Sequence, residues 1–388
     1  ILLVGASIAL TFLFNIYTGL LQGLQRFDVA NGINVVVSLI RAAVIVVVLR
    51  AGGDVVAMAW IQFWFTVLNG FVSLYAAHVL MKRAGLSIKP IKVVGRKLRA
   101  LLRLVSGYSV YVFINNIGQK LAFATDAMVI SIFLPVSAVT YYAIAGNLIS
   151  YLSSLVVATA QVFNPVASQY AAKNDRSGLR ALMLRSTRLN LAIGLPVIGA
   201  YVVLGDIFIG LWMGPEFADH AYPVLLILAV TQILSCPHYP IASILYGIGR
   251  HRTLALLRLA EGFINVALSI FLVKSFGLPG VAIGTAIPHT IIFGVIVPLY
   301  ACRLLGVPWL QYLRQSMLGP LLNVVPFVIA AWLIREYVAL QNLLMFFLIV
   351  AALSALYLMS GYRLCLRDDE RDVVRRYVKN RWSAGVAQ

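Results

Sequence analysis

The residues with the clearest chemical potential are charged side chains that stand inside long apolar stretches. Arg41 lies in the apolar run 31–50, and Asn34 and Ser38 precede it at spacings that place all three on one face of a helix. Because a charge at the centre of a membrane-spanning helix costs about 2.5–3.5 kcal/mol, such a residue indicates a function or a partner. A guanidinium can donate two parallel hydrogen bonds to phosphate, so Arg41 predicts a site for an anionic group.

Each of these charges also has a structural explanation. Arg41 could form an ion pair with Glu261 or Asp126. Alternatively, the long Arg41 side chain could extend along the helix and place its guanidinium at the membrane interface. Lys120 lies in the apolar run 104–133. Its ammonium could hold a second phosphate oxygen, release a proton if buried, or pair with a carboxylate of another helix. Asp126 stands about 120° around the same helix from Lys120, so these two residues need not pair.

A second polar stripe lies in the run 253–274. Arg258, Glu261 and Asn265 follow one another at spacings of three and four, as the polar residues of the first stripe do. We expect the two stripes to face each other across a cavity. The candidate substrate-binding residues are Arg41, Lys120, Asn34, Ser38 and Asn265.

No catalytic or metal-binding pattern accompanies these charges. The five histidines are scattered, and none stands at ligand spacing from another histidine, a cysteine or a carboxylate. No glycine-rich phosphate loop is present, which argues against ATP hydrolysis. We therefore expect neither an enzyme nor a metal site.

The composition places these residues in a membrane. Hydrophobic residues make up 61% of the 388-residue chain, and charged residues only 11%, against about 25% in a globular domain. Apolar runs of about 20 residues, long enough to span hydrocarbon as helices, recur along the sequence. The net charge of +18 is explained by cations in cytoplasmic loops, so nucleic acid is not an expected partner.

The apolar runs predict an all-α integral membrane protein with about eleven spanning helices. Of the 31 Lys and Arg residues, 26 fall in alternate loops and the C-terminal tail, three fall in the opposite loops, and Arg41 and Lys120 lie within helices. This asymmetry predicts that residue 1 is outside and the C-terminus is cytoplasmic. The predicted helices are approximately 1–20, 31–50, 55–80, 104–133, 137–165, 186–212, 221–246, 253–274, 279–302, 312–334 and 341–362.

The basic segment 82–103 divides the chain, because it carries eight cations and no acid. Lys92, Arg96, Arg99 and Arg103 recur at spacings of four, three and four, which is typical of an amphipathic helix in the cytoplasmic interface. The predicted parts are the second half of an N-terminal lobe (1–81), this linker (82–103), a six-helix C-terminal lobe (104–304), a terminal helix pair (305–362) and a cytoplasmic tail (363–388).

The two lobes are related by an internal repeat. Leu21-Gln22-Gly23-Leu24-Gln25-Arg26 aligns with Leu245-Tyr246-Gly247-Ile248-Gly249-Arg250 at an offset of 224 residues, and the same offset brings Arg41 to Asn265 and Gly53 to Gly277. Both copies cross the membrane in the same direction, so the repeat is parallel, with its axis along the membrane normal.

The chain also resembles a known family. It is similar to the polysaccharide-transport branch of the multidrug/oligosaccharidyl-lipid/polysaccharide exporter superfamily, over nearly its whole length. The stretches that carry the resemblance are Gly19-Leu20-Leu21-Gln22-Gly23-Leu24-Gln25-Arg26-Phe27, Thr125-Asp126-Ala127-Met128-Val129-Ile130 leading to Tyr141-Tyr142, Gly210-Leu211-Trp212-Met213-Gly214-Pro215-Glu216-Phe217, Gly247-Ile248-Gly249-Arg250, Glu261 with Asn265, and Phe276-Gly277-Leu278-Pro279-Gly280-Val281-Ala282-Ile283-Gly284-Thr285.

The resemblance implies a flippase that carries polyprenyl-diphosphate-linked oligosaccharide to the outer leaflet of a bacterial inner membrane by alternating access. Such proteins commonly have fourteen helices, so three helices are expected to be missing before residue 1. The expected partners are the lipid-linked saccharide, membrane lipid, and a polysaccharide polymerase or glycosyltransferases. No cofactor is expected beyond a coupling H⁺ or Na⁺, for which Asp126 and Glu261 are the candidates. The alternatives are a cation-coupled multidrug exporter and a non-transporting subunit of a polysaccharide assembly complex.

Overall fold

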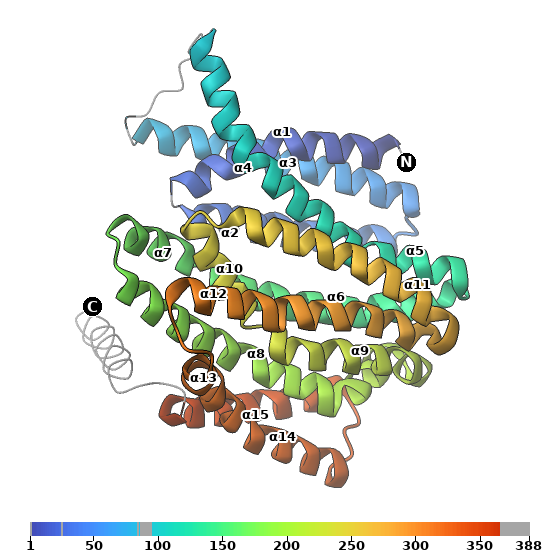
Figure 1. Cartoon of the computed structure of the whole chain (residues 1–388). Coiled ribbons are helices and arrows are strands. Elements are labelled where there is room, and N and C mark those ends of the chain that lie inside the picture. Colours follow the sequence, from blue (N-terminus) through green and yellow to red (C-terminus); the bar gives the residue numbers. More distant parts are fainter. Residues whose placement is uncertain (1, 25, 84, 86–94, 365–388) are drawn as a thin grey trace, which may run out of the picture. The chain divides into compact units, whose positions relative to one another are not determined.

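The fold is built from helical rods joined by short turns. The structure, a computed structural model, describes residues 2–24, 26–83, 85 and 95–364, and within these ranges it contains no strand. Eight helical segments are long and apolar enough to cross a membrane. The longest, His251–Leu305, folds back at Gly277 and therefore supplies two rods, while α1 and the pair α4–α5 bring the number to eleven. The predicted all-α membrane fold is confirmed (Figure 1).

The helical elements have the following bounds. In chain order they are α1 (Leu2–Gly23), α2 (Phe27–Arg50), α3 (Val55–Arg83), α4 (Arg96–Phe123), α5 (Thr125–Phe133), α6 (Val136–Gln161), α7 (Phe163–Ala172), α8 (Arg176–Met213), α9 (Pro215–Ser235), α10 (His238–Gly247), α11 (His251–His289), the π-helical turn η1 (Thr290–Ile296), α12 (Val297–Leu305), α13 (Trp309–Tyr312), the π-helical turn η2 (Leu313–Met317), α14 (Leu318–Tyr337) and α15 (Leu343–Leu364).

The chain divides into two compact units, Ile1–Leu98 and Arg99–Gln388. In the first unit α3 packs against both α1 and α2, and a small cluster of Leu21, Ala30 and Ala77 is fully buried at their junction. Other faces of α2 expose large apolar side chains such as Leu39 and Val47. This unit is thus a group of three helices that exposes many large apolar side chains, as expected for helices in lipid.

The core of the second unit surrounds α8. This helix packs against α9, α6 and α14, and its buried residues contribute to all three hydrophobic clusters of the unit. Asp175 caps its first turn, because the carboxylate accepts a hydrogen bond from the Gly178 amide at 2.9 Å. α8 therefore begins ten residues before the predicted span 186–212.

The two halves of α11 form an antiparallel hairpin. Gly277 has φ +60° and ψ −136°, a conformation that glycine adopts without steric cost and that reverses the chain. After this turn Gly284 approaches the Ser269 backbone so closely that a Cβ would lie 2.7 Å from its nitrogen. The predicted helices 253–274 and 279–302 are these two halves, the second continuing through η1 and α12 (Figure 1).

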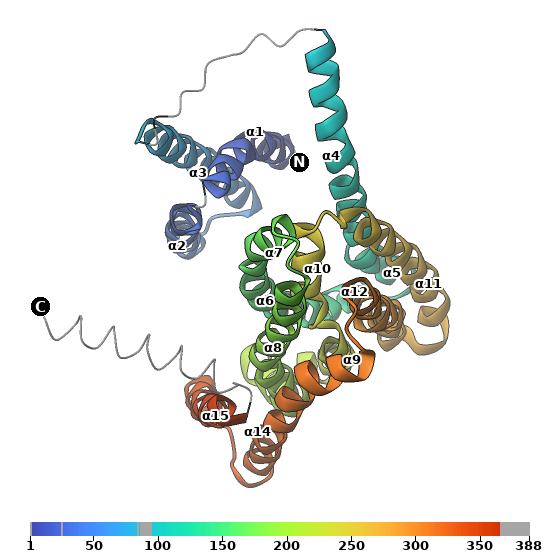
Figure 2. The same ribbon diagram turned by 60° about the vertical axis from the view of Figure 1, so that its left-hand side comes forward.

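The terminal pair α14–α15 packs on α8 within the second unit (Figure 2). Phe327, Phe346 and Tyr357 are buried against Val203 and Leu204 of α8. Arg335 of α14 also forms a two-point ion pair with Asp206 of α8, with N–O distances of 3.0 and 2.6 Å. The pair 305–362, predicted as a separate part, thus shares a core with the C-terminal lobe.

Two predicted segments fall largely outside the described residues. They are most of the linker 82–103, with its Lys92, and nearly all of the tail 363–388. The described end of the linker differs from its predicted boundary, because Arg96, Arg99 and Arg103 already belong to the backbone of α4. The predicted helix 104–133 is also interrupted at Ala124, between α4 and α5.

Candidate functional site

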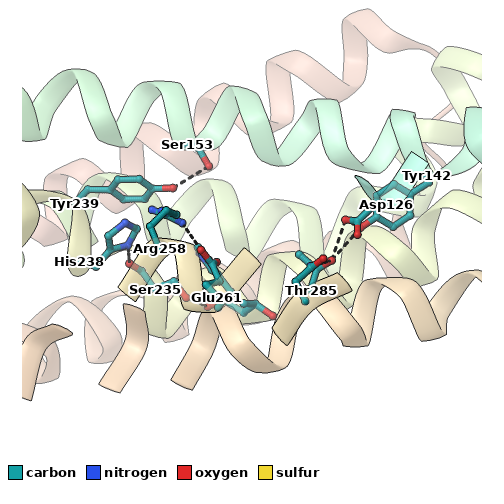
Figure 3. Close-up of polar contacts among 12 residues, drawn as sticks. Asp126, Tyr142, Ser153, Ser235, His238, Tyr239, Arg258, Glu261 and Thr285 are labelled. Atoms are coloured by element: carbon teal, nitrogen blue, oxygen red, sulfur yellow. Dashed lines mark hydrogen bonds and ion pairs between the residues drawn. The ribbon is translucent and has the colours of Figure 1, made fainter. Parts of the chain in front are cut away.

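Asp126 lies at the centre of a buried polar group formed by three helices of the second unit. The side chain of this α5 residue is 1% exposed. Its Oδ2 accepts hydrogen bonds from the Tyr142 hydroxyl of α6 at 2.6 Å and from the Thr285 hydroxyl of α11 at 2.9 Å. Asn265, on the other half of α11, donates from Nδ2 to Thr285 Oγ1 at 2.8 Å. Figure 3 shows Tyr142 and Thr285 converging on the carboxylate.

Two oxygens of this group have no partner among the described residues. They are Asp126 Oδ1 and Asn265 Oδ1, and both are buried. An ionised carboxylate in an apolar interior requires compensation by a proton, a cation or several donors. The donors here are neutral hydroxyls on one oxygen only, so the chemistry of the group suits a proton or a hard cation with oxygen ligands.

Glu261 is the centre of a second buried group, one helical turn before Asn265. Its side chain is 1% exposed, with Oε2 2.7 Å from Arg258 Nη1 and Oε1 2.6 Å from His289 Nδ1. Arg258 also places its Cζ 3.8 Å from the centre of the Phe293 ring, a cation–π contact. Glu261 is therefore compensated within its own unit, in contrast to Asp126.

His238 extends the Glu261 group toward α10. Its ring lies 4.6 Å from that of Phe293 and 5.9 Å from that of His289, and its Nδ1 is 2.6 Å from the Ser235 carbonyl oxygen. Because a carbonyl only accepts, this nitrogen carries the proton. Figure 3 shows the His238–Arg258–Glu261 side chains and the Asp126 group following one another along the α11 hairpin.

The first unit carries its polar residues at the boundary between α2 and α3. Arg41 Nη1 donates to Gln62 Oε1 at 2.9 Å, and Asn69 Nδ2 donates to Asn34 Oδ1 at 3.0 Å. Among the described residues of this unit no carboxylate pairs with Arg41; Asn34 and Gln62 are exposed, and Arg41 and Asn69 are half-buried. We call the four residues Asn34, Arg41, Gln62 and Asn69 the α2–α3 ladder.

Some contacts of the ladder have counterparts at the positions that the predicted repeat relates to them. Adding 224 to Asn34 and Asn69 gives Arg258 and Phe293, which also contact each other. The same offset brings Arg41 to Asn265 and Gln62 to the residue after Thr285, the partner of Asn265. The α2–α3 pair and the α11 hairpin thus both place side chains in contact at these related positions, with different charges.

The remaining predicted residues stand apart from these contacts. Ser38 is exposed on α2, and Lys120 is exposed on α4 one turn before the break at Ala124. Near Lys120, Gly118 crosses α11 so closely that a Cβ would lie 2.7 Å from the Arg258 carbonyl oxygen. Lys120 thus lies beside the point where α4 contacts α11.

Sequence reasoning missed several members of both groups. Tyr142, Thr285 and His289 are ordinary in type and lie 16, 159 and 28 residues from the carboxylates that they contact. Gln62 and Asn69 of the ladder were also missed. The signal that could have found them is the turn that contains Gly277, because an antiparallel hairpin centred two residues before it, at 275, brings position 265 opposite 285 and position 261 opposite 289.

Comparisons with known proteins agree with this arrangement. A family model described as "Polysaccharide biosynthesis protein" matches residues 1–171, and the MatE model matches residues 112–271. The uncharacterized membrane protein EpsK of Bacillus subtilis is 30% identical over 214 residues, and the probable low-salt glycan biosynthesis flippase Agl15 of Haloferax volcanii is 28% identical over 189 residues. The chain is thus similar, over parts of its length, to the polysaccharide biosynthesis and MatE families and to a probable glycan flippase.

The match to these exporter-superfamily relatives is partial on both sides. It covers 54% and 49% of this chain and spans 41% and 40% of the relatives' own lengths. In fold, the chain is similar to the lipid II flippase MurJ in an inward closed conformation, with a TM-score of 0.66 and 15% identity over 93% of this chain and 73% of that one. Agl15 and MurJ are both named as flippases, which agrees with the expectation of a transporter rather than an enzyme.

Proposed function

We propose that the protein is a flippase that moves a polyprenyl-diphosphate-linked oligosaccharide from the cytoplasmic to the outer leaflet by alternating access, for cell-surface polysaccharide synthesis. The observation that carries this proposal is the state of Arg41, whose guanidinium is bonded to a neutral amide rather than to a carboxylate. Its charge is therefore available to a phosphate. Two named flippases among the similar proteins support the same substrate class.

The test is lipid transfer by the full-length protein in liposomes. A fluorescent saccharide on a short polyprenyl diphosphate, added to one leaflet, should reach the other leaflet in the presence of the protein. Replacing both Arg41 and Lys120 by Ala should abolish the transfer while the protein still inserts. Transfer at the wild-type rate by that double variant would contradict the proposal.

The buried Asp126 group supports coupling of transport to H⁺ or Na⁺. Asp126 and Asn265 would hold the cation through the two oxygens that have no partner among the described residues, with Thr285 and Tyr142 orienting the carboxylate. A bound cation supplies the positive charge that the neutral hydroxyls lack. Transfer should then depend on a Na⁺ or pH gradient across the liposome, and replacement of Asp126 by Asn should remove that dependence.

A second candidate function is a cation-coupled exporter of small cationic compounds on the same fold. The observation in its favour is again Asp126, since a buried carboxylate attracts cations. Binding measurements on the purified protein separate the two candidates. A flippase should bind farnesyl diphosphate but not ethidium, whereas a drug exporter should bind ethidium but not farnesyl diphosphate. A non-transporting assembly subunit would move no lipid in the liposome experiment.

We also propose a location in the bacterial inner membrane, with the C-terminus in the cytoplasm and polysaccharide polymerase or glycosyltransferases as partners. The support is the distribution of cations in the sequence, which crowd into alternate loops. A reporter fused after residue 388 should be active in the cytoplasm. Labelling of a cysteine introduced at Asp54, in the α2–α3 turn, by an impermeant reagent should occur from outside.

A further inference from the structure

The hydrogen bond between Arg41 and Gln62 fixes one side of the guanidinium and leaves its charge intact. Gln62 Oε1 accepts from Arg41 Nη1 at 2.9 Å across the α2–α3 boundary. The Gln62 side chain also contacts its own helix, because its Nε2 donates to Thr66 Oγ1 at 3.5 Å, and the Thr66 hydroxyl is oriented by donating to the backbone carbonyl oxygen of Gln62 at 2.8 Å. The amide therefore presents its oxygen to α2 from an anchored position.

The choice of an amide has a definite chemical consequence. A guanidinium has five N–H donors, and a carboxylate can take two of them while cancelling the charge. An amide oxygen accepts from one of these donors and leaves the positive charge of the guanidinium in place. The repeat-related hairpin uses the other solution, since Arg258 is 2.7 Å from the carboxylate of Glu261 and stacks on Phe293. One hairpin thus neutralises its arginine, and the other orients it.

The position of Arg41 on α2 shows which way its remaining donors face. Val36, Leu39 and Val47 are exposed large apolar residues, and they lie about 160–240° around the helix from Arg41. The buried Val37 and Ala30 lie within about 40° of it. Because lipid contact would cost an arginine several kcal/mol, the apolar side of α2 is the lipid side and the ladder lies away from it.

We propose that Gln62 is a positioning residue for Arg41, which orients the guanidinium toward the diphosphate of the lipid-linked substrate while preserving its charge. This inference rests on the proposed function. It assigns a role to an uncharged residue that does not itself bind the phosphate, and it explains why the partner of Arg41 is glutamine and not glutamate.

The experiment measures binding of farnesyl diphosphate to the full-length protein in nanodiscs, with farnesol as the uncharged reference. Gln62→Ala should weaken binding of the diphosphate about three- to tenfold, the effect of one lost hydrogen bond. Gln62→Glu should weaken binding of the diphosphate more than Gln62→Ala does, because the new carboxylate would form an ion pair with Arg41 and neutralise the charge that attracts the phosphate. Farnesol binding should change little in either variant, and the thermal unfolding midpoint of Gln62→Glu should not fall.

A matched control separates this role from general electrostatics. Asn69→Asp adds the same charge to the same face of α3, seven residues away, where its neighbour is Asn34 rather than Arg41. Its effect on binding should be smaller than that of Gln62→Glu. Equal effects of these two variants, or tighter binding by Gln62→Glu than by Gln62→Ala, would overturn the positioning role. Undiminished binding by Arg41→Ala would instead refute the anion site of the proposed function.

Discussion

Glu261 Oε1 lies 2.6 Å from His289 Nδ1, and this contact joins the two halves of α11 across 28 residues of sequence. The other carboxylate oxygen lies 2.7 Å from Arg258 on the preceding turn. A carboxylate that is 1% exposed is thereby held between a cation and an imidazole N–H. This group therefore links the two halves of α11 at Glu261, and the Asp126 group links them one helical turn further along, at Asn265.

Removing the Glu261 charge should destabilise the protein. Glu261→Ala leaves the Arg258 side chain, which is 13% exposed, without its carboxylate, and breaking a buried pair on one side costs about 3–5 kcal/mol. The exposed pair Asp206–Arg335 provides the comparison, because its side chains are 26% and 36% accessible. Asp206→Asn should cost about 1 kcal/mol or less. Unfolding midpoints of the purified variants measure both effects, and a larger loss for Asp206→Asn would contradict this account.

Replacement of Asp126 by Asn should separate cation binding from folding. The amide keeps an acceptor for Tyr142 and Thr285 and removes a charge that has only neutral donors. Stability in KCl should therefore be unchanged or higher. In the wild type, a bound cation at about 100 times its Kd adds about 2.7 kcal/mol, so NaCl or acid should raise the unfolding midpoint, and the variant should lose that rise. A variant that responds to Na⁺ and pH like the wild type would place the cation elsewhere.

The crossing of α4 and α11 should not tolerate a larger residue. A Cβ at Gly118 would lie 2.7 Å from the Arg258 carbonyl carbon, so Gly118→Ala should cost about 1–3 kcal/mol and should reduce lipid transfer. Gly146 of α6 has no atom within 4 Å of the corresponding position. Gly146→Ala should accordingly stabilise its helix by about 0.5–1 kcal/mol. Thermal unfolding and transfer assays on the two variants check the contrast.

The cap of α8 should contribute a stability that depends on pH. The Ser177 hydroxyl, at 2.6 Å, and the Gly178 amide hold the pKa of the Asp175 carboxyl below its usual range. A lowered folded-state pKa means that the contribution is complete above the unfolded-state pKa and is lost as pH falls through the folded value. Asp175→Ala should therefore lower the unfolding midpoint at pH 7 and converge with the wild type in strong acid. Ser177→Ala should give a smaller change of the same sign.

Much of the fold could be predicted from the sequence because it follows from apolar run length. The eleven rods of the described residues and the positions of Arg41, Asp126 and Glu261 rest on local features, namely hydropathy and rare charges. Helix ends outside the apolar runs were less predictable. α8 continues to Arg176 because Asp175 caps it, and α4 begins at Arg96.

The partners of the candidate residues could not be predicted, because they depend on which helices pack together. Asn265 was expected beside a substrate, and it contacts Thr285 next to Asp126. Thr285 and Tyr142 become informative only when α5, α6 and α11 are assembled. The sequence does not distinguish Gln62 from the other Asn and Gln residues, because its contact with Arg41 depends on the packing of α3 against α2.

The polar contacts along the α11 hairpin also have a consequence for assembly. Lipid chains are as apolar as leucine, so apolar side chains alone do not specify the relative axial position of two packed membrane helices. In α11 the contacts 261–289, 265–285 and 269–281 share one register, because each pair is centred on the same residue of the turn. A slip of one residue would break all of them at once and leave several polar groups buried without partners. The same side chains that form the candidate sites therefore fix the alignment of the two helices.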